Sequence, residues 1–447
     1  MNDYSRIPFD GIRQPQRILS VLVAGYVALL PFQFQVTKGV NFAPSDCLML
    51  LVLLFAAGQL KYRTAAWSIW HFGIPMVFAV GSLVAAVRFG ALDRYELLNK
   101  DAGLLLPFLS YAAITSAIND WEDLRRIMRV FTLSVALQNI LCVGGFLAAY
   151  FFGVTNPFTR YAGQRLAGML IDPNAYGGLL IAALVMCEGA SIGPAPLFKG
   201  PTLWLCRLTL GMGLLFTFSR SAWTGLGLAL LLLCVIQMRT AVRLILAGLI
   251  AAPGLLLLMG NRFIPVFEEM ASRPKQVQGR FDLIHAAFDA FTGHPFLGGG
   301  IGSFRLGEGE IAHNTAMWFL ADFGIVGLIV LLGFLGWFFA KSWSAYGSAP
   351  RQSQPLVLAL LLAHTAMFGL AMGIEAFYQR HWWLVLGLIA SSYSLTLSPV
   401  NGRSLKCDPG AGPLAPPAST TDPYGPGVSR AFEPEPQGDE VVGLVPD

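Results

Sequence analysis

The sequence predicts an all-α membrane protein that crosses the bilayer about twelve times. Hydrophobic residues make up 55% of the 447 positions and charged residues only 13%, with a mean hydropathy of +0.59, so this composition cannot cover a water-soluble surface. Apolar runs long enough to cross a hydrocarbon core recur along the chain. One long polar stretch, residues 261–314, interrupts them and contains a segment with helical spacing.

The apolar runs define the predicted membrane helices. A span needs roughly 20 apolar residues, and about 17 suffice where tilt or neighbouring helices compensate. About twelve runs of this order lie between charges or Gly and Pro clusters. They fall near residues 18–36, 44–60, 70–88, 103–118, 129–153, 175–192, 201–218, 221–238, 241–260, 315–340, 355–374 and 381–398. The first run lacks a clear small-residue cleavage signal, so we expect a retained span rather than a signal peptide.

The distribution of Lys and Arg predicts the orientation of these helices, because short cytoplasmic loops are enriched in both. With both chain ends in the cytoplasm, the inner side receives Arg6, Arg13, Arg17, Lys61, Arg63, Arg125, Arg126, Arg129, Lys199, Arg239, Arg243, Lys341 and Arg351. The outer side then collects residues 88–102, 154–174, the Ser219–Arg220 turn, 261–314 and 375–381. The predicted organisation is a cytoplasmic N-terminus (1–17), membrane helices one to nine (18–260), a long non-cytoplasmic loop (261–314), helices ten to twelve (315–398) and a cytoplasmic tail (399–447).

The predicted tail differs in composition from the rest of the chain. Residues 399–447 hold ten Pro, show no apolar periodicity and scatter acidic residues such as Glu433 and Asp439. Such a segment buries too little apolar surface to offset its chain entropy. We therefore predict that the tail is disordered.

Composition also excludes several classes of function. A net charge of +4 is too small to indicate a nucleic-acid partner. The six Cys form no C-x-x-C pair, so neither a disulfide framework nor a zinc site is predicted. Ionisable residues within the apolar runs are few, which leaves little from which to build a proton or ion relay. They include Glu188, Arg207, Asp322 and His364, whereas most other ionisable residues sit at loops or at the ends of runs.

Polar residues gather instead on the predicted outer face. Arg offers a planar fork of donors that matches phosphate oxygens and keeps its charge, so an outward cationic site suits a lipid-linked phosphate or pyrophosphate. The polar residues of that face are Arg160, Arg165, Asp172, Arg220, Arg262, Arg273, Lys275, Arg280, His294, Arg305, His313, Glu375 and Arg380.

Arg220 is the most informative of these residues, because the sequence TFSRSAW places it between two apolar runs with only a turn around it. A charge in such a place is costly unless it is used. The alternative is an arginine that reaches the lipid headgroups from a helix end.

The long outer segment contains a predicted amphipathic helix. In GRFDLIHAAFDAF the residues Phe281, Ile284, Phe288 and Phe291 recur at helical spacing, which indicates a helix lying on the outer leaflet. It should end at Gly293. The sequence HPFLGGGIGSFR follows, a Gly-rich bend whose backbone N–H groups could approach a ligand, or simply a flexible re-entry loop.

His313 precedes the tenth apolar run in the sequence AHNTAMW, in which Asn314 or Thr315 is a plausible N-cap. Histidine is the side chain that can take up a proton near neutral pH, so His313 is a candidate general base. The alternative is that His313 only joins the capping network or the interfacial belt.

Four segments taken in order resemble the O-antigen ligase and polymerase superfamily of bacterial envelope proteins. They are RLAGMLIDPNAYGGLL (165–180), SRSAWTGLGLAL (219–230), GRFDLIHAAFDAFTGHPFLGGGIGSF (279–304) and HNTAMWFLADFGIVGLI (313–329). Together with the twelve-span layout and one long outer loop, the resemblance covers most of residues 18–398.

The resemblance implies a metal-independent glycosyltransferase without cofactors, located in the bacterial inner (cytoplasmic) membrane with its active site facing the periplasm. It would take a glycan from undecaprenyl pyrophosphate and transfer it to an acceptor hydroxyl on lipid A-core or a similar glycan. Arg220 and Arg280 match the arginines assigned to the donor pyrophosphate, and His313 matches the histidine assigned to acceptor activation. Arg165 matches a further basic position ahead of the Asp-Pro-Asn motif.

Two positions depart from the family pattern. Ile284 stands where an aromatic residue is common, and Asp322 with Phe323 replaces a more usual Glu-Thr pair. We expect these changes to bear on which acceptor fits.

The chemistry of the residues agrees with this implied activity. Pyrophosphate is a good leaving group, so the reaction chiefly needs cations to stabilise its growing charge and a base to take the acceptor proton. A ligase and a polymerase that joins lipid-linked repeats remain alternatives. A transporter of lipid-linked glycans is a further alternative, although transporters place their binding groups near the bilayer midplane. The last alternative is a scaffold protein in an export complex, which would dock through the Pro-rich tail.

Overall fold

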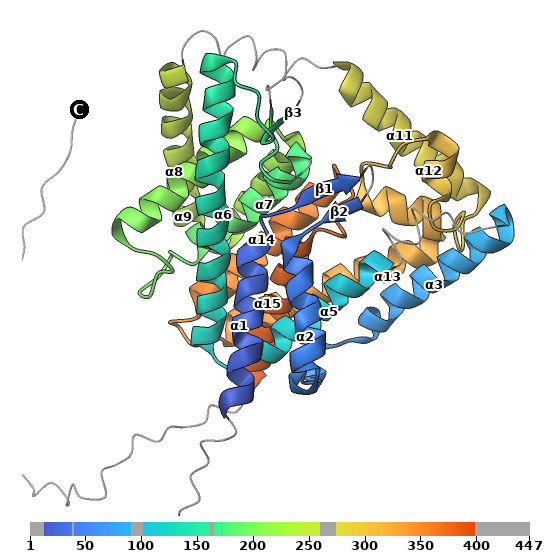
Figure 1. Ribbon diagram of the computed structural model, residues 1–447, viewed down its shortest axis with the longest axis horizontal. Coiled ribbons are helices and arrows are strands. Elements are labelled where there is room, and N and C mark those ends of the chain that lie inside the picture. The colour runs from blue at the N-terminus through green and yellow to red at the C-terminus, as the bar shows by residue number, and fades with distance from the viewer. Residues whose placement is uncertain are drawn as a thin grey trace, which may run out of the picture. The chain divides into compact units, whose positions relative to one another are not determined.

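The computed structural model describes residues 13–37, 40–90, 102–160, 165–170, 172–259 and 274–397. In these residues the chain forms thirteen α-helices and two short antiparallel hairpins (Figure 1). The helices are α1 (Arg13–Leu29), α2 (Pro44–Ala56), α3 (Ile69–Phe89), α5 (Ala102–Ala117), α6 (Trp121–Phe152), α7 (Pro173–Gly189), α8 (Gly200–Thr217), α9 (Arg220–Met259), α11 (Pro274–Gly293), α12 (Ser303–Glu308), α13 (Thr315–Ser348), α14 (Gln354–Ala371) and α15 (Arg380–Leu397). The hairpins pair β1 (Phe34–Thr37) with β2 (Val40–Phe42) and β3 (Thr159–Arg160) with β4 (Arg165–Leu166). The predicted α-helical class is confirmed for these residues, whereas the predicted tail at 399–447 lies outside them.

Each predicted apolar run coincides with a helix. The twelve runs fall on eleven helices, because 221–238 and 241–260 both lie in α9, which is interrupted by non-helical backbone at Gln237 (φ −144°, ψ 69°). Five of the described helices contain segments long and apolar enough to cross a membrane, and three shorter apolar helices accompany them. The five segments are Ile69–Phe89, Trp121–Phe152, Arg220–Ile250, Thr315–Ser348 and Gln354–Ala371. By helix length and composition, this is a multi-pass membrane protein.

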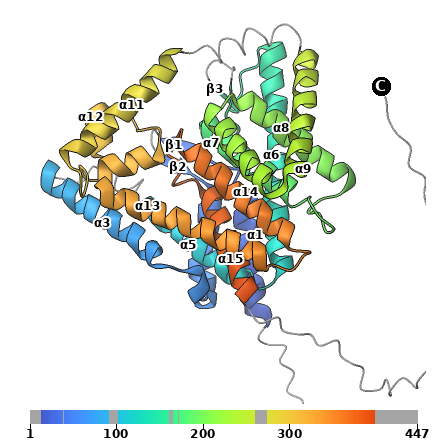
Figure 2. The ribbon, with the colours of Figure 1, turned by 180° about the vertical axis from the view of Figure 1, so that it is seen from behind.

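The buried centre of the bundle is formed by α14 and α15. The most apolar stretch of α14 is 89% buried, against 17% for that of α9, so other helices surround α14. Both ribbon views show α14 and α15 between two groups of helices, with α6, α8 and α9 on one side and α3, α11 and α13 on the other (Figures 1 and 2). Because α14 packs against α7, α9 and α13, it connects these groups.

The peripheral helices carry exposed apolar stripes. On α3, the side chains of Ile69, Phe72, Met76, Leu83 and Val87 are exposed and recur at helical spacing. Exposed stripes of this kind would be unstable against water and suit contact with lipid chains. We therefore expect the exposed sides of α3 and α9 to face lipid.

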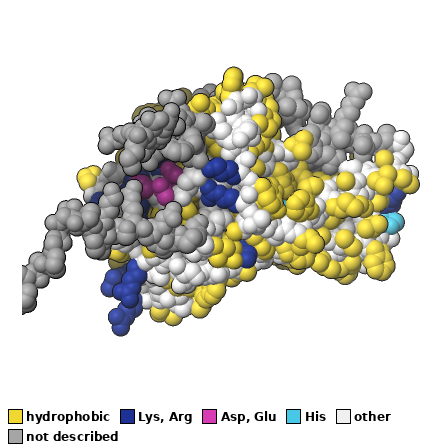
Figure 3. Space-filling model, turned by 90° about the horizontal axis from the view of Figure 1, so that it is seen from below, with side chains coloured by type: hydrophobic (Ala, Val, Ile, Leu, Met, Phe, Trp, Pro, Cys, Tyr) yellow, Lys and Arg dark blue, Asp and Glu magenta, His cyan; other side chains and the backbone are white. Residues whose placement is uncertain are grey.

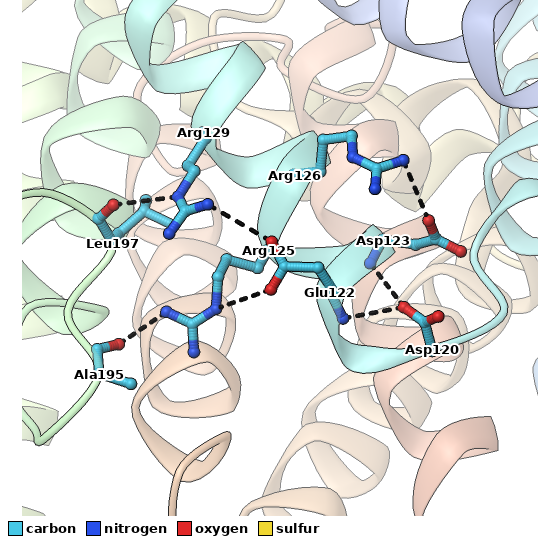
Figure 4. A network of polar contacts seen from close by, with 8 residues as sticks. All are labelled: Asp120, Glu122, Asp123, Arg125, Arg126, Arg129, Ala195 and Leu197. Atoms are coloured by element: carbon cyan, nitrogen blue, oxygen red, sulfur yellow. Dashed lines mark hydrogen bonds and ion pairs between the residues drawn. The ribbon is translucent and has the colours of Figure 1, made fainter.

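The start of α6 joins the loop between α7 and α8. The Asp120 side chain caps α6 by accepting hydrogen bonds from the backbone N–H groups of Glu122 and Asp123 (2.9 and 2.8 Å). Arg125 and Arg129 then donate to the carbonyl oxygens of Ala195 (2.7 Å) and Leu197 (3.1 Å), as Figure 4 shows. Seen from below, this end of the molecule exposes Lys and Arg side chains beside apolar surface (Figure 3). The cytoplasmic location of this end stays a prediction.

Two of the charged residues predicted inside the apolar runs neutralise each other across neighbouring helices. The Arg207 guanidinium donates two hydrogen bonds to the Glu188 carboxylate (2.6 and 2.8 Å), which joins α8 to α7. A bidentate pair of this kind offsets the desolvation of both charges. It is therefore a structural link between helices rather than an ion site.

Candidate active site

The turn between α8 and α9 presents Arg220 at the start of a helix. Phe218 ends α8 in the left-handed conformation (φ 48°), which bends the chain back within two residues. Ser219 then caps α9, since its hydroxyl oxygen accepts the backbone N–H of Ala222 (3.2 Å). Arg220 is the first residue of α9 and its side chain is exposed. The predicted tight turn at Ser219–Arg220 is confirmed.

Arg165 supports this turn through hydrogen bonds to the end of α8 and the start of α7. Its side chain is buried, its Nε donates to the Thr217 carbonyl oxygen (2.9 Å), and its Nη2 donates to Asn174 Oδ1 (3.1 Å). The Ser219 hydroxyl donates to the same Asn174 oxygen (2.9 Å). Arg165 thus fixes the end of α8 to the start of α7, and its part in donor binding stays a prediction.

Arg280 reaches the same turn from the predicted amphipathic helix. α11 spans Pro274–Gly293, so the prediction of a helix that ends at Gly293 is confirmed. Phe281 and Phe288 are exposed on it, whereas Arg280 is half-buried and its Nη1 donates to the Ser221 hydroxyl (3.4 Å). Because Ser221 follows Arg220 directly, this contact brings the two arginines to the same helix start.

The Gly-rich bend after α11 is built into the protein. α13 is broken at Gly324 (φ 66°, ψ −162°), and the N–H groups of Ile325 and Val326 donate to the carbonyl oxygens of Pro295 (2.9 Å) and Phe296 (3.3 Å). In return Gly299 and Gly300 donate to the carbonyl oxygens of Ala321 and Asp322 (both 2.9 Å).

These bonds contradict one of the two predicted roles of the bend, the role in which its backbone N–H groups approach a ligand. The N–H groups of residues 298–302 all donate to acceptors within the protein. The break in α13 leaves backbone carbonyl groups without helical partners, and the N–H groups of Gly299 and Gly300 satisfy two of them. Gly300 has φ 96°, and a side chain there would collide with the backbone of Ala85 in α3. The glycines therefore serve close packing.

Asp322 holds the bend in place. Its buried carboxylate accepts hydrogen bonds from the backbone N–H groups of Gly302 (2.8 Å) and Phe304 (3.0 Å), and from the Ser303 hydroxyl (3.1 Å) and Trp318 Nε1 (2.8 Å). The acidic residue at this position binds the protein's own loop. Its expected bearing on the acceptor stays a prediction.

His313 lies at the start of α13 in a left-handed conformation (φ 50°), which few non-glycine residues adopt. Of the two predicted N-cap candidates, Asn314 caps the helix, since its Oδ1 accepts the backbone N–H groups of Ala316 (3.0 Å) and Met317 (3.1 Å). The cap therefore needs no contribution from the half-buried imidazole of His313. Unusual backbone conformations held by their surroundings are frequent at functional sites.

Several charged groups act on His313. Burial lowers its pKa below the ordinary value of 6.5, and the positive charge of Arg280 lowers the pKa further, whereas Glu375, Asp172 and Glu310 raise it. The imidazole is therefore mostly neutral at pH 7 and able to accept a proton. The helices that precede and follow this segment, α11 and α13, also pack against each other.

Other predicted members of the cationic face are engaged elsewhere. Arg380 donates two hydrogen bonds to the Asp46 carboxylate (2.7 and 2.6 Å), which joins α15 to α2. Arg160 donates to the carbonyl oxygens of Pro157 and Thr159 (both 3.0 Å). Arg262, Arg273 and the side chain of Lys275 lie outside the described residues. Among the described residues, His, Cys, Asp and Glu form no group suited to hold a metal ion.

Sequence reasoning gave no role to several residues of the site. Ser221, Asn174 and Ser219 hold the arginines or their turn, and Glu375 and Asp172 influence His313. Asp172 and Glu375 fall on the predicted outer face, so their location was available from the sequence. Their proximity to His313 was not, because residues 172, 313 and 375 are far apart in the chain.

Fold and site together define a multi-pass helical membrane protein whose polar site is assembled at the ends of helices. Residues 205–332 match the model of the O-antigen ligase family. The resemblance carried by the motifs and the prediction of an enzyme are therefore confirmed for this segment, which is similar to an O-antigen ligase domain. The match includes Arg220, Arg280 and His313, whereas Arg165 precedes it. No curated protein matches the chain.

Proposed function

We propose that this protein is an O-antigen ligase-like glycosyltransferase, which moves a glycan from undecaprenyl pyrophosphate to an acceptor hydroxyl of lipid A-core or a similar glycan. The observation that carries the proposal is the hydrogen bond from Arg280 to Ser221, because it joins α11 to the helix start that bears Arg220. The charge of the same arginine acts on His313. We infer that these three residues, which have complementary chemistry and come from three separate segments, form one site.

Arg220 and Arg280 bind the donor pyrophosphate in this proposal. When the bond between the anomeric carbon and the pyrophosphate oxygen breaks, negative charge grows on the leaving group. Two guanidinium groups stabilise that charge without a change in their own protonation. The exposed position of Arg220 at the start of α9 suits a ligand that arrives from the membrane surface, and the positive end of the helix dipole adds to the attraction.

His313 is the general base. Its neutral imidazole takes the proton of the acceptor hydroxyl as that oxygen forms the new bond to the anomeric carbon, and the electron pair of the broken bond leaves with undecaprenyl pyrophosphate. Atoms and charge balance without a cofactor. The reaction is metal-independent in this proposal, since the arginines supply the positive charge that a metal ion supplies in other transferases.

The site faces the periplasm from the bacterial inner membrane in this proposal, with about twelve membrane spans. Support comes from the end of α6 that bears Arg125, Arg126 and Arg129, because it lies at the opposite end of this 32-residue helix from Gly153, after which the predicted outer segment 154–174 begins. A helix of that length is about 48 Å long, enough to separate the two faces of a bilayer.

The surface glycans of a deletion strain test the proposal. A ligase is expected to leave the acceptor without any attached glycan, while undecaprenyl-linked chains accumulate. A polymerase of the same family would instead leave a single repeat attached, because only chain growth is lost. Unchanged attachment and chain length would contradict both, and complementation with the parent gene must restore the profile.

A further inference from the structure

The turn between α14 and α15 contacts both halves of the site. We define it as the 372–376 turn. Asn314 Nδ2 donates to the Met372 carbonyl oxygen (3.0 Å), and the Thr315 hydroxyl donates to the Ile374 carbonyl oxygen (2.9 Å). The same Thr315 oxygen accepts the backbone N–H of residue 376 (2.9 Å). The turn is thus fixed to the residues that follow His313.

The other side of the 372–376 turn lies against the start of α9. A side chain at Gly373 would collide with the Ser221 hydroxyl, so the backbone of the turn packs directly on the residue that accepts Arg280. Only a residue without a side chain allows this approach. The turn therefore sets the separation between the histidine side and the arginine side of the site.

Glu375 provides the charged contact of this turn. Its Oε1 accepts the backbone N–H of Ala312 (3.3 Å), the residue before His313, and its side chain is half-buried. Together with the Asn314 and Thr315 contacts, this bond fixes the backbone on both sides of His313. A left-handed conformation at a histidine persists only where the surroundings determine it in this way.

We propose that Glu375 is a positioning residue for the transfer reaction, which holds His313 in its left-handed conformation and offsets the charge of Arg280 there. This inference rests on the proposed function, because it assigns to Glu375 a role that acts through the base. Glu375 is not expected to exchange protons with the substrate. Its negative charge offsets the effect of the Arg280 guanidinium, so that His313 can act as a base beside a positive charge.

The charges around His313 come from four segments. Arg280 of α11 lowers the pKa of His313, whereas Glu375, Asp172 and Glu310 raise it. Asp172 Oδ1 is already engaged in capping α7 through Asn174 (2.8 Å), and Glu310 is exposed, so water screens its charge. Glu375 is therefore the carboxylate best placed to act on His313.

The test compares Glu375→Gln with Glu310→Gln in purified full-length protein. Glutamine keeps a carbonyl oxygen for the Ala312 N–H but removes the charge. Without that charge the pKa of His313 falls further, so transfer should persist to lower pH than in the parent. The rate on the plateau should fall roughly 10-fold to 100-fold, since the imidazole is a weaker base without that charge and a neutral amide holds the Ala312 N–H less firmly than a carboxylate does. Glu310→Gln removes an exposed carboxylate from the loop between α12 and α13, and it should behave like the parent.

A second measurement separates this inference from the proposed function. The rate at which diethyl pyrocarbonate modifies His313, followed by mass spectrometry of its peptide, reports the neutral imidazole whether or not the protein transfers glycans. Its midpoint should move to lower pH in Glu375→Gln but not in Glu310→Gln. An unmoved midpoint overturns the role of Glu375. Parental transfer rates in His313→Asn would overturn the base instead, and with it the proposed mechanism.

Discussion

Arg280 donates a hydrogen bond to the Ser221 hydroxyl (Nη1 to Oγ, 3.4 Å), although 59 positions separate the two residues. This contact fastens the amphipathic helix α11 to the first turn of α9. Because Ser221 is buried and also touches the 372–376 turn, Arg280 is held by a rigid part of the bundle. A preorganised guanidinium stabilises developing charge better than one that must be ordered during the reaction.

The first prediction concerns this arginine and its neighbour. Arg220→Lys and Arg280→Lys keep the positive charge but lose the planar fork that fits two phosphate oxygens. We expect each to lower kcat/KM for transfer by about 100-fold, in line with the loss of one preorganised donor. The measurement is glycan transfer from the undecaprenyl-linked donor by purified protein.

Arg160→Lys is the matched control for these variants. Arg160 donates to carbonyl oxygens of its own loop, and we expect nearly parental transfer when it is replaced. If correctly folded Lys variants at 220 and 280 were as active as this control, both arginines would be anchors at the membrane surface rather than ligands of the pyrophosphate.

The second prediction separates base from cap at the start of α13. Asn314 supplies the cap, and asparagine tolerates a left-handed backbone, so His313→Asn should fold like the parent. It should bind the donor but transfer it about 10²-fold to 10⁴-fold more slowly, which is the usual contribution of a general base. A rate within about tenfold of the parent would exclude His313 as the base.

The pH dependence of transfer follows from the same residue. A base works in its neutral form, and burial together with Arg280 lowers the pKa of His313 below 6.5. The rate should therefore rise with pH to a midpoint below 6.5 and stay constant above it. A midpoint well above 6.5 would point to a different titrating group.

Local patterns predicted the helices well, because hydrophobicity and spacing are properties of neighbouring residues. The stripe in 281–291 and the cap at Asn314 were found in this way. The break at Gly324 and the brace at Arg165 were not, since both depend on partners far along the chain. The same limitation applies to the site: motifs predicted Arg220, Arg280 and His313, whereas the contributions of Ser221 and Glu375 arise from packing alone.

The fourth prediction concerns orientation. If Lys and Arg mark the cytoplasmic side, a single Cys at position 275 should react with an impermeant thiol reagent added to spheroplasts. A single Cys at position 126, on the opposite end of the bundle, should react only after permeabilisation. Both are placed in a chain whose native cysteines have been replaced. Labelling in the opposite sense would put the candidate site in the cytoplasm.

The last prediction concerns Asp322, which accepts four hydrogen bonds from the bend and from Trp318. Asp322→Asn removes the charge and one acceptor oxygen, and leaves buried donors such as the N–H of Gly302 without a partner. Breaking such a network costs about 3 kcal/mol or more, so the melting temperature in detergent should fall by several degrees.

Asp289→Asn is the control for this variant, because it changes an exposed carboxylate on α11, and it should melt like the parent. Because the bend connects α11 to α13, transfer by Asp322→Asn should also decline at temperatures where the parent is stable, and Asp322→Glu should retain more of it. An Asp322→Asn protein that melts with the parent would show that the bend is held by its backbone bonds to the break at Gly324.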